Sequence, residues 1–284
     1  MIPRDIRDQE YMLATTWEDA ARQIKDHMSN GYALTSISYG DIADYDDDDA
    51  EYTLGFFIVM SKGTDWNDQQ MIECPSKPGF FSRKSLSKTI SQELSKGRSI
   101  TNILLVGDKF VVFSAQVDNV ESQEWYTVKG TKALKQLIRK NWDRDYIVSV
   151  MVNEPNDKDD IGVIFSKVKN NQIQRMTNFD YMPDPEDFEC IEEDDNVMSE
   201  LFLYVPRFDD WDSDASLFAA ANTNVGWDSH CIYVGDTLAE IDEDIDADLE
   251  EMKDENEENE APEYYILKCA YFQHQWIVVM GCPM

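Results

Sequence analysis

The side chains of this 284-residue chain that could most readily bind cations or transfer protons are the carboxylates of Asp and Glu, and they are concentrated near one end. Residues 236–260 carry 14 Asp and Glu side chains, and Asp242-x-Asp244-x-Asp246 begins like the calcium loop of an EF-hand. Position six of such a loop would be Ala247 instead of glycine, and position twelve would be Lys253 instead of a bidentate glutamate. The pattern therefore predicts loose screening by divalent cations and no specific metal site.

Nucleophilic and metal-ligating residues are few, and their spacing matches no known motif. Of three histidines, His27 falls late in an expected helix, where a cation complements the helix dipole. The groups His230-Cys231 and Cys269, His274 and Cys282 have no zinc-ligand spacing. The five cysteines lack CxxC pairs, which predicts buried thiols in a reducing cytoplasm: Cys74, Cys190, Cys231, Cys269 and Cys282.

Motifs of catalysis are also missing. The chain has no phosphate loop, dinucleotide fingerprint, nucleophile elbow or HExxH. Asp228, Ser229 and His230 are adjacent in sequence, which is not triad geometry. With 57 acidic residues, a carboxylate pair for glycoside chemistry could be drawn anywhere. We therefore predict a non-enzymatic protein with no catalytic, cofactor-binding or metal-binding residues, and an enzyme with an unlocated carboxylate site is the least favoured alternative.

The elements that position these residues recur along the chain as a helix followed by two apolar strands. In the first copy, Thr15 or Thr16 caps a helix from about Trp17 to Asn30, and Gly31 ends it before strands at 32–40 and 54–63. The next two copies have helices at 82–96 and around 134–142, with strands at 99–107, 109–115, 145–152 and 161–167. A degraded fourth copy has expected strands at 215–221 and 230–235, and the fifth has strands at 264–271 and 275–281.

The first copy contains a pattern of small, polar and apolar residues: Gly31-Tyr32, Thr35-Ser36, Tyr39-Gly40, Val59-Met60-Ser61-Lys62-Gly63 and Gln69-Gln70. Ser122 to Trp125 and Gln275 to Met280 repeat parts of it. The pattern resembles an uncharacterised repeat domain that follows the kinase domain of some plant casein-kinase-I-like kinases and also occurs in bacterial proteins, with a tight match only over about residues 31–70. The resemblance implies a repeat architecture and no particular activity.

Units of this size cannot bury their own apolar faces, so they must stack on one another. We expect an α+β fold of about five helix-strand-strand units with mostly antiparallel sheet, arranged as a propeller-like ring or a solenoid. The ring is favoured because it leaves no exposed sheet edges. Residues 1–175 hold units one to three, and residues 176–284 hold the degraded fourth unit and the fifth within the same fold unit.

The negative charge is concentrated in the second of these regions. The whole chain has a net charge of -32, of which residues 1–175 contribute -5 and residues 176–284 contribute -27. Such a surface repels nucleic acid and anionic membrane and attracts basic proteins. No stretch reaches the roughly 18 apolar residues of a membrane span. We expect a cytoplasmic protein whose partner is a basic surface, with no direct binding of nucleic acid or membrane.

Residues 236–260 look like a low-complexity tail, but an apolar stripe predicts a helix there instead. Leu238, Ile241, Ile245, Leu249 and Met252 recur at helical spacing, and a disordered acidic linker is the alternative. A packed helix would hold its carboxylates in a fixed array. The expected partner-binding residues are Asp209, Asp210, Trp211, Asp212, Asp242, Glu243, Asp244, Asp246, Asp248, Glu250 and Glu251.

Two functions fit this surface. The first is an inhibitor that occupies a basic, nucleic-acid-binding surface of another protein, as a phage-encoded antagonist of a defence nuclease would. The second is a self-assembling scaffold, because basic residues cluster at 77–98 and 129–144 and could meet the acidic region of another copy.

Overall fold

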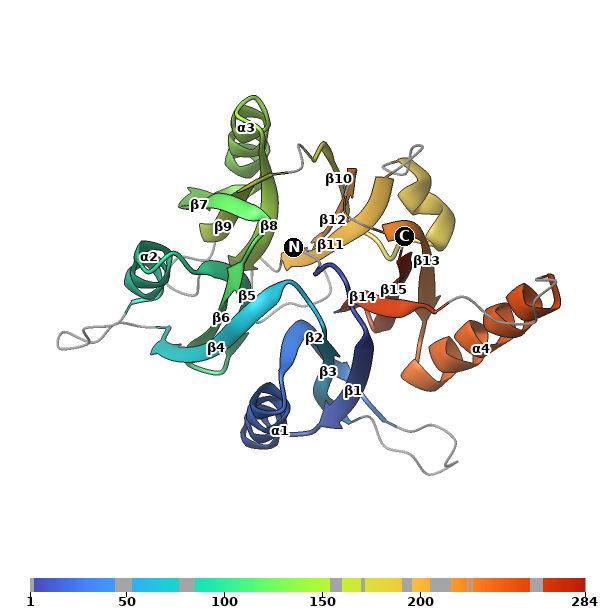
Figure 1. The fold of residues 1–284 in the computed structure, drawn as a ribbon. Helices are drawn as coiled ribbons and strands as arrows, with labels where there is room; N and C mark the ends of the chain where they lie inside the picture. Colours follow the sequence, from blue (N-terminus) through green and yellow to red (C-terminus); the bar gives the residue numbers. More distant parts are fainter. Residues whose placement is uncertain are drawn as a thin grey trace.

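The computed structural model describes residues 3–43, 53–76, 85–153, 160–169, 172–190, 196–204, 216–223, 225, 227–255 and 263–283. Within them, the same order of elements occurs five times: a strand, a helix and two further strands (Figure 1). The first three units are β1 (Asp8–Ala14), α1 (Trp17–Ser29), β2 (Tyr32–Asp41) and β3 (Leu54–Lys62); β4 (Trp66–Pro75), α2 (Leu86–Ser95), β5 (Ser99–Val106) and β6 (Lys109–Val117); and β7 (Val120–Lys129), α3 (Gly130–Trp142), β8 (Tyr146–Asn153) and β9 (Asp160–Val168).

The last two units complete the chain. They are β10 (Gln174–Phe179), the 3-10 helix η1 (Pro185–Cys190), β11 (Asn196–Tyr204) and β12 (Ser216–Thr223); and β13 (Trp227–Gly235), α4 (Leu238–Glu255), β14 (Tyr265–Phe272) and β15 (Gln275–Pro283). Each unit forms one three-stranded antiparallel sheet with its last strand in the middle, in the order β1-β3-β2 for the first. We number these sheets 1 to 5 in chain order. The expected α+β class with mostly antiparallel sheet is confirmed.

Two details of the expected units were wrong. Each of the first four units begins with a strand that the sequence interpretation omitted, and this strand pairs with the unit's last strand. Residues 230–235 were assigned to the fourth copy, but they lie in β13 and pair with β15 in sheet 5. The second strand of sheet 4 is instead β11, which was not anticipated. Alternating apolar residues identify a strand, but they do not say which sheet it joins.

Capping residues define the starts of the first two helices: α1 begins at Trp17 as expected, whereas α2 begins at Leu86 and not at residue 82. Thr16 accepts a hydrogen bond from the Asp19 N–H at the start of α1, and Gly31 adopts a φ of +86° just beyond its end. Ser85 caps α2 in the same way through the Lys88 N–H. None of the described helices is both long and apolar enough to cross a membrane.

The five sheets stand around a common centre, with α1 to α3 toward the outside (Figure 1). Five of the buried hydrophobic clusters each join one unit to a neighbour. The cluster around Ile24 of α1 includes Phe113 of sheet 2, and the cluster around Ile90 of α2 includes Ile164 of sheet 3. The remaining three clusters join sheets 3 and 4, sheets 4 and 5, and sheets 5 and 1. The hydrophobic core therefore lies between sheets.

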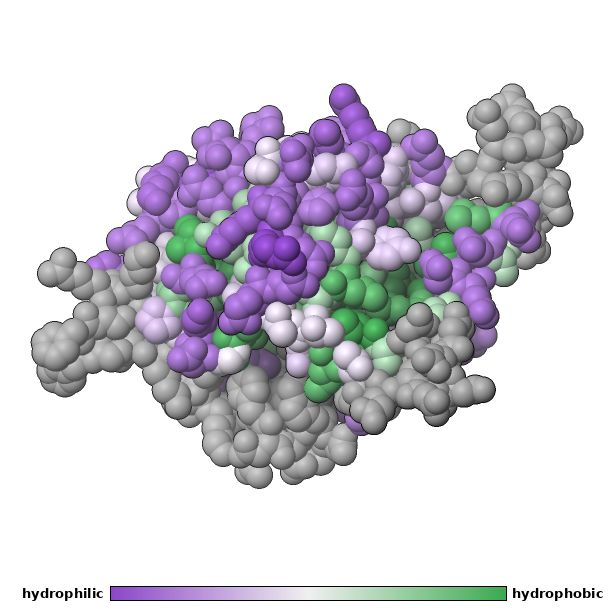
Figure 2. Space-filling view, turned by 90° about the horizontal axis from the view of Figure 1, so that it is seen from below, coloured by the Kyte–Doolittle hydropathy of each residue, from purple (hydrophilic) through white to green (hydrophobic). Residues whose placement is uncertain are grey.

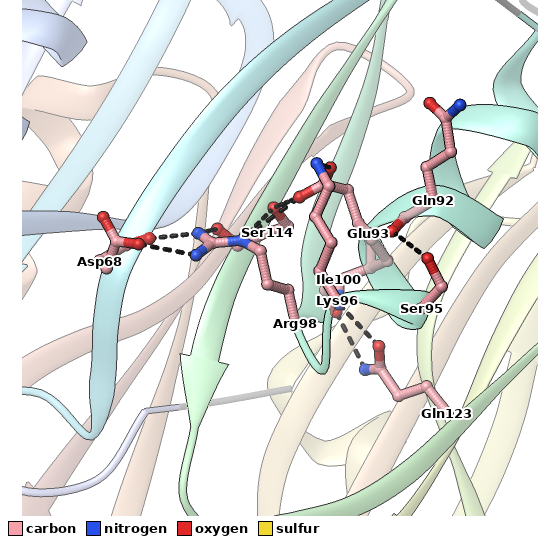
Figure 3. Close-up of polar contacts among 9 residues, drawn as sticks. All are labelled: Asp68, Gln92, Glu93, Ser95, Lys96, Arg98, Ile100, Ser114 and Gln123. Carbon is pink, nitrogen blue, oxygen red and sulfur yellow. Dashed lines mark hydrogen bonds and ion pairs between the residues drawn. The ribbon is translucent and has the colours of Figure 1, made fainter.

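A glutamine side chain on the first strand of four units joins that unit to the previous one. The Gln123 Oε1 atom accepts the Ile100 N–H at 2.6 Å, and its Nε2 donates to the Ile100 carbonyl at 3.1 Å (Figure 3). Gln69 makes the same pair of bonds to Leu34, and Gln174 makes it to Val148. Gln9 makes it to Ile266, 257 residues away.

All four clamped residues directly precede a β-bulge in the second strand of their unit, which is an edge strand. An edge strand leaves backbone N–H and C=O groups without partners in its own sheet. A primary amide carries one acceptor and one donor group, so a single glutamine satisfies both. We call this contact the glutamine clamp. β13 contains no glutamine, so the contact between sheets 4 and 5 differs.

An ion-pair network centred on the buried Arg98 joins α2 to the strands of sheet 2. Arg98, only 6% exposed, lies 3.3 Å from the Glu93 carboxylate and 2.8 Å from that of Asp68, and it donates to the Ser114 carbonyl (Figure 3). Burial alone would raise the pKa of Glu93, but hydrogen bonds from Lys96 and Ser114 and the charge of Arg98 lower it overall. Glu93 is therefore held ionised, and it links α2 to the strands beneath it.

The glutamine clamp predicts that Gln123→Leu destabilises the protein by about 2 kcal/mol, because it leaves a backbone donor and acceptor of Ile100 without partners. Urea unfolding followed by tryptophan fluorescence measures this. Gln116→Leu is the matched control, since Gln116 is exposed on β6, and it should change stability by less than about 0.5 kcal/mol. Equal stability of the two variants would contradict the role given to the clamp.

Candidate functional site

Helix α4 occupies the helix position of the fifth unit, and its start has strong local signals. The Glu240 N–H donates to Thr237 Oγ1 at 3.0 Å, and the Asp236 N–H donates to Glu240 Oε2 at 2.8 Å. This closely matches a capping box, in which a threonine and a glutamate three residues later satisfy the first backbone donors. The expected helix over residues 236–260 is confirmed for 238–255, and residues 256–260 lie outside the described residues.

The apolar stripe of α4 packs against the body of the protein. Ile241 is 3% exposed in a cluster with Tyr233 and Trp276 of sheet 5 and Phe57 of sheet 1. Leu238 and Ile245 are partly buried against the same cluster, and Leu249 is also half-buried. The Tyr233 hydroxyl donates to Asp248 Oδ2 at 3.0 Å. The helix is therefore attached by its apolar face, as the sequence predicted, up to Glu250; the side chain of Met252 lies outside the described ones.

The opposite face of α4 presents carboxylates to solvent. Of the expected partner-binding residues, those with exposed side chains are Asp242, Glu243, Asp244, Asp246 and Glu250. Asp248 is half-buried beneath the Tyr233 hydroxyl, and Glu251 lies in α4 with a side chain outside the described ones. Among the described side chains, no ion pair involves any of these carboxylates.

The second group of expected partner-binding residues, Asp209 to Asp212 with Trp211, falls outside the described residues. Whether it joins α4 in one surface therefore stays a prediction.

The EF-hand-like segment is helical. Asp242 and Asp246 lie one turn apart on α4, whereas Asp244 points about 160° away from that side at 100° per residue. Three carboxylates so placed cannot converge on one ion. In the described part of the chain, no three His, Cys, Asp or Glu residues are grouped as metal ligands.

His27 and the cysteines, which could also take part in chemistry, make contacts that fit a structural role. The His27 ring lies 2.9 Å from both the Gln23 carbonyl and the Glu10 carboxylate. Burial alone would lower the pKa of His27, but these hydrogen bonds raise it above its usual value. Cys74 and Cys269 are buried, and the four cysteines whose side chains are described are not in disulfides. These contacts favour the protonated form of His27, whose positive charge at the end of α1 would complement the helix dipole.

An exposed apolar patch lies on β1, and the sequence interpretation missed it because it assigned no strand there. Tyr11 is 59% exposed and Leu13 45% exposed. Tyr11 and Leu13 lie two and four residues after Gln9 on the same strand, so all three side chains face the same side of the sheet. Gln9 clamps Ile266 of sheet 5, so this is the side that faces sheet 5. The Tyr11 ring lies 5.9 Å from Phe57, which shares its cluster with Ile241 of α4. We call Tyr11 and Leu13 the β1 patch.

In the first three units, a side chain of the helix is hydrogen-bonded to the first strand of the next unit. Trp17 of α1 donates to Glu73 of β4, and Ser87 of α2 accepts from Trp125 of β7. Trp142 of α3 likewise donates to Gln174 of β10. No described side chain of α4 makes such a bond to β1. Figure 2 shows hydrophobic surface between the hydrophilic body and the acidic helix on this side of the molecule.

No protein-family model and no curated protein sequence matches the chain. The resemblance to the repeat domain of plant kinases therefore stays a prediction, and the interpretation of the site depends on its geometry alone.

The buried stripe predicts that Ile241→Ala releases α4 from the body. Loss of an Ile side chain from a packed site costs about 2–5 kcal/mol, so amide exchange across residues 238–250 should accelerate at least about tenfold. Hydrogen–deuterium exchange with mass spectrometry measures this. Asp246→Ala removes an exposed side chain from the same helix and should leave exchange unchanged. Similar exchange in both variants would show that α4 is not held by its stripe.

Proposed function

We propose that this protein binds, without catalysis, a basic nucleic-acid-binding surface of another protein and inhibits it by occupying that surface. The observation that carries the proposal is that α4 is packed on one face and covered with exposed carboxylates on the other. A partner therefore meets these charges at fixed positions, which lowers the entropy lost on binding. A protein of a phage that disables a defence nuclease would need such a surface.

The charge density of α4 supports imitation of a nucleic acid. Ten of its 18 residues are acidic, and at about 1.5 Å per residue the helix is about 27 Å long. That is one negative charge per about 2.7 Å, against one per about 1.7 Å along duplex DNA. A surface that binds phosphates through several Lys and Arg side chains would accept this array. Direct binding of nucleic acid to α4 is opposed by the same charge.

The β1 patch gives this surface a candidate anchor. Charged rims govern association rates and orientation, whereas a few buried central side chains, Tyr among the commonest, supply most of the binding energy. Tyr11 and Leu13 would provide that contact beside the acidic helix. A partner with basic side chains around an apolar centre fits both features better than a uniformly basic one.

Self-assembly is the second candidate, and helix α3 favours it. Lys132, Lys135, Arg139 and Lys140 have exposed side chains on α3, so an acidic and a basic helix are both present on one chain. Contact of α4 with α3 of another copy would be head-to-tail and would extend into rings or filaments. Light scattering over a wide concentration range separates the two: growth of particle mass at low salt supports assembly, and a constant monomer mass removes it.

We also propose that the five units form one closed, propeller-like ring. Two observations support this: the Gln9 clamp on Ile266 joins the first unit to the last, and the cluster around Trp276 includes Phe57 of sheet 1. Residues 1–175 and 176–284 would then differ in net charge but would belong to the same structural unit, since both regions contribute to the ring.

The proposed function predicts that the α4 carboxylates dominate binding to basic polymers. Asp242→Asn, Glu243→Gln, Asp244→Asn and Asp246→Asn combined should weaken binding of fluorescent poly-L-arginine about tenfold at low salt, because each exposed charge contributes a few tenths of a kcal/mol. Fluorescence anisotropy measures this, and the affinity should fall steadily as salt is raised.

The matched control neutralises four exposed carboxylates in the near-neutral region: Glu18, Asp26, Asp118 and Glu121. It should weaken binding less than about threefold. If both quadruple variants lose affinity equally, only the net charge matters and α4 is not the docking surface. Binding that does not respond to salt would also contradict the proposal.

A further inference from the structure

A central pocket lies where the second strands of all five units meet. Its volume is about 580 Å³, and its walls come from β2, β5, β8, β11 and β14. Pockets that bind small molecules fall in the range of roughly 300 to 1,000 Å³. The pocket is formed by the arrangement of the sheets and is separate from α4 and the β1 patch, neither of which lines it.

Lys268 is the one charged residue among the described residues that line the pocket. It is 7% exposed and follows the bulge that the Gln9 clamp fixes in β14. Burial lowers the pKa of Lys268 to about 8, below that of a solvated lysine. Lys268 also takes part in an interaction within the protein. A cation is thus held at the wall of a cavity in a strongly acidic protein.

The rest of the lining combines apolar walls with neutral polar groups. Ile103 and Val150 contribute aliphatic surface, and Asn102 and Asn153 contribute side-chain amides. Tyr39 and Tyr271 add aromatic rings from the first and last units. Apolar walls with a few placed polar groups are typical of sites for small organic ligands. None of the described lining residues is a carboxylate, and the one among them that carries a full charge is Lys268.

We propose that the central pocket binds a small organic anion, with its anionic group toward Lys268 and its apolar or aromatic body against the aliphatic walls. The ligand is a carboxylate, sulfonate or phosphate compound with a ring system, small enough for the cavity. This site does not depend on the function proposed for α4, because the two surfaces share no residue. The protein would then bind two partners of opposite charge at separate places: a basic macromolecule outside and an anionic small molecule at its centre.

The test uses the full chain with two probes of the same shape, 1-naphthalenesulfonate and the neutral 1-naphthalenemethanol. Isothermal titration calorimetry should show one site for the sulfonate and at least about tenfold weaker binding of the neutral probe. Lys268→Met should weaken the sulfonate about tenfold and leave the neutral probe nearly unchanged. Lys135→Met, which removes the same charge from an exposed position on α3, should bind like the unchanged protein.

A second variant keeps the proposal testable if Lys268→Met does not fold. Asn153, half-buried at the end of β8, lines the pocket, and Asn153→Trp should fill it and abolish binding of both probes while circular dichroism stays unchanged. The proposal is overturned if the unchanged protein binds no sulfonate at millimolar concentration. It is also overturned if the two probes bind equally, or if the folded Asn153→Trp variant binds as before. None of these results would alter the poly-L-arginine experiment.

Discussion

Contact between neighbouring sheets is the constraint on which the rest of the structure depends. A three-stranded sheet with one short helix cannot bury both of its faces, so each hydrophobic cluster is completed by residues of a neighbouring unit. The second strand of each unit is an edge, and glutamine clamps such as Gln123 on Ile100 satisfy its exposed backbone groups. Apolar packing supplies most of the free energy, and the clamps fix how the sheets are placed.

This constraint explains how so acidic a helix can be ordered. Carboxylates four residues apart on α4 repel one another, and the helix would be marginal by itself. It is held because it fills the helix position of the fifth unit, where Ile241 completes the cluster shared with Phe57 of sheet 1. The acidic face is thus the outer side of an element that the fold needs anyway. The central pocket has the same origin, because the five second strands surround it.

The sequence predicted those parts of the fold that local periodicity encodes. Helix α1 and the stripe through Leu238 and Ile245 follow from helical spacing, and the apolar strands follow from β-rich runs. Pairing between strands is not local, so β13 was assigned to the wrong sheet and the half-exposed β1 was missed. No pattern in the sequence indicated that Lys268 is buried, because its burial depends on strands from other units. Glutamines that recur before four of the five helices were the clue that could have revealed the first strands of those units.

Amide hydrogen exchange across the whole chain tests the central claim most directly. If the units form a closed ring joined by Gln9 and Ile266, the central strands β3 and β15 should be protected as strongly as β9, and all should exchange through one cooperative opening. In an open stack the terminal repeats open independently of the middle ones. Protection of β3 and β15 that is lower than that of β9 by orders of magnitude would therefore contradict the account.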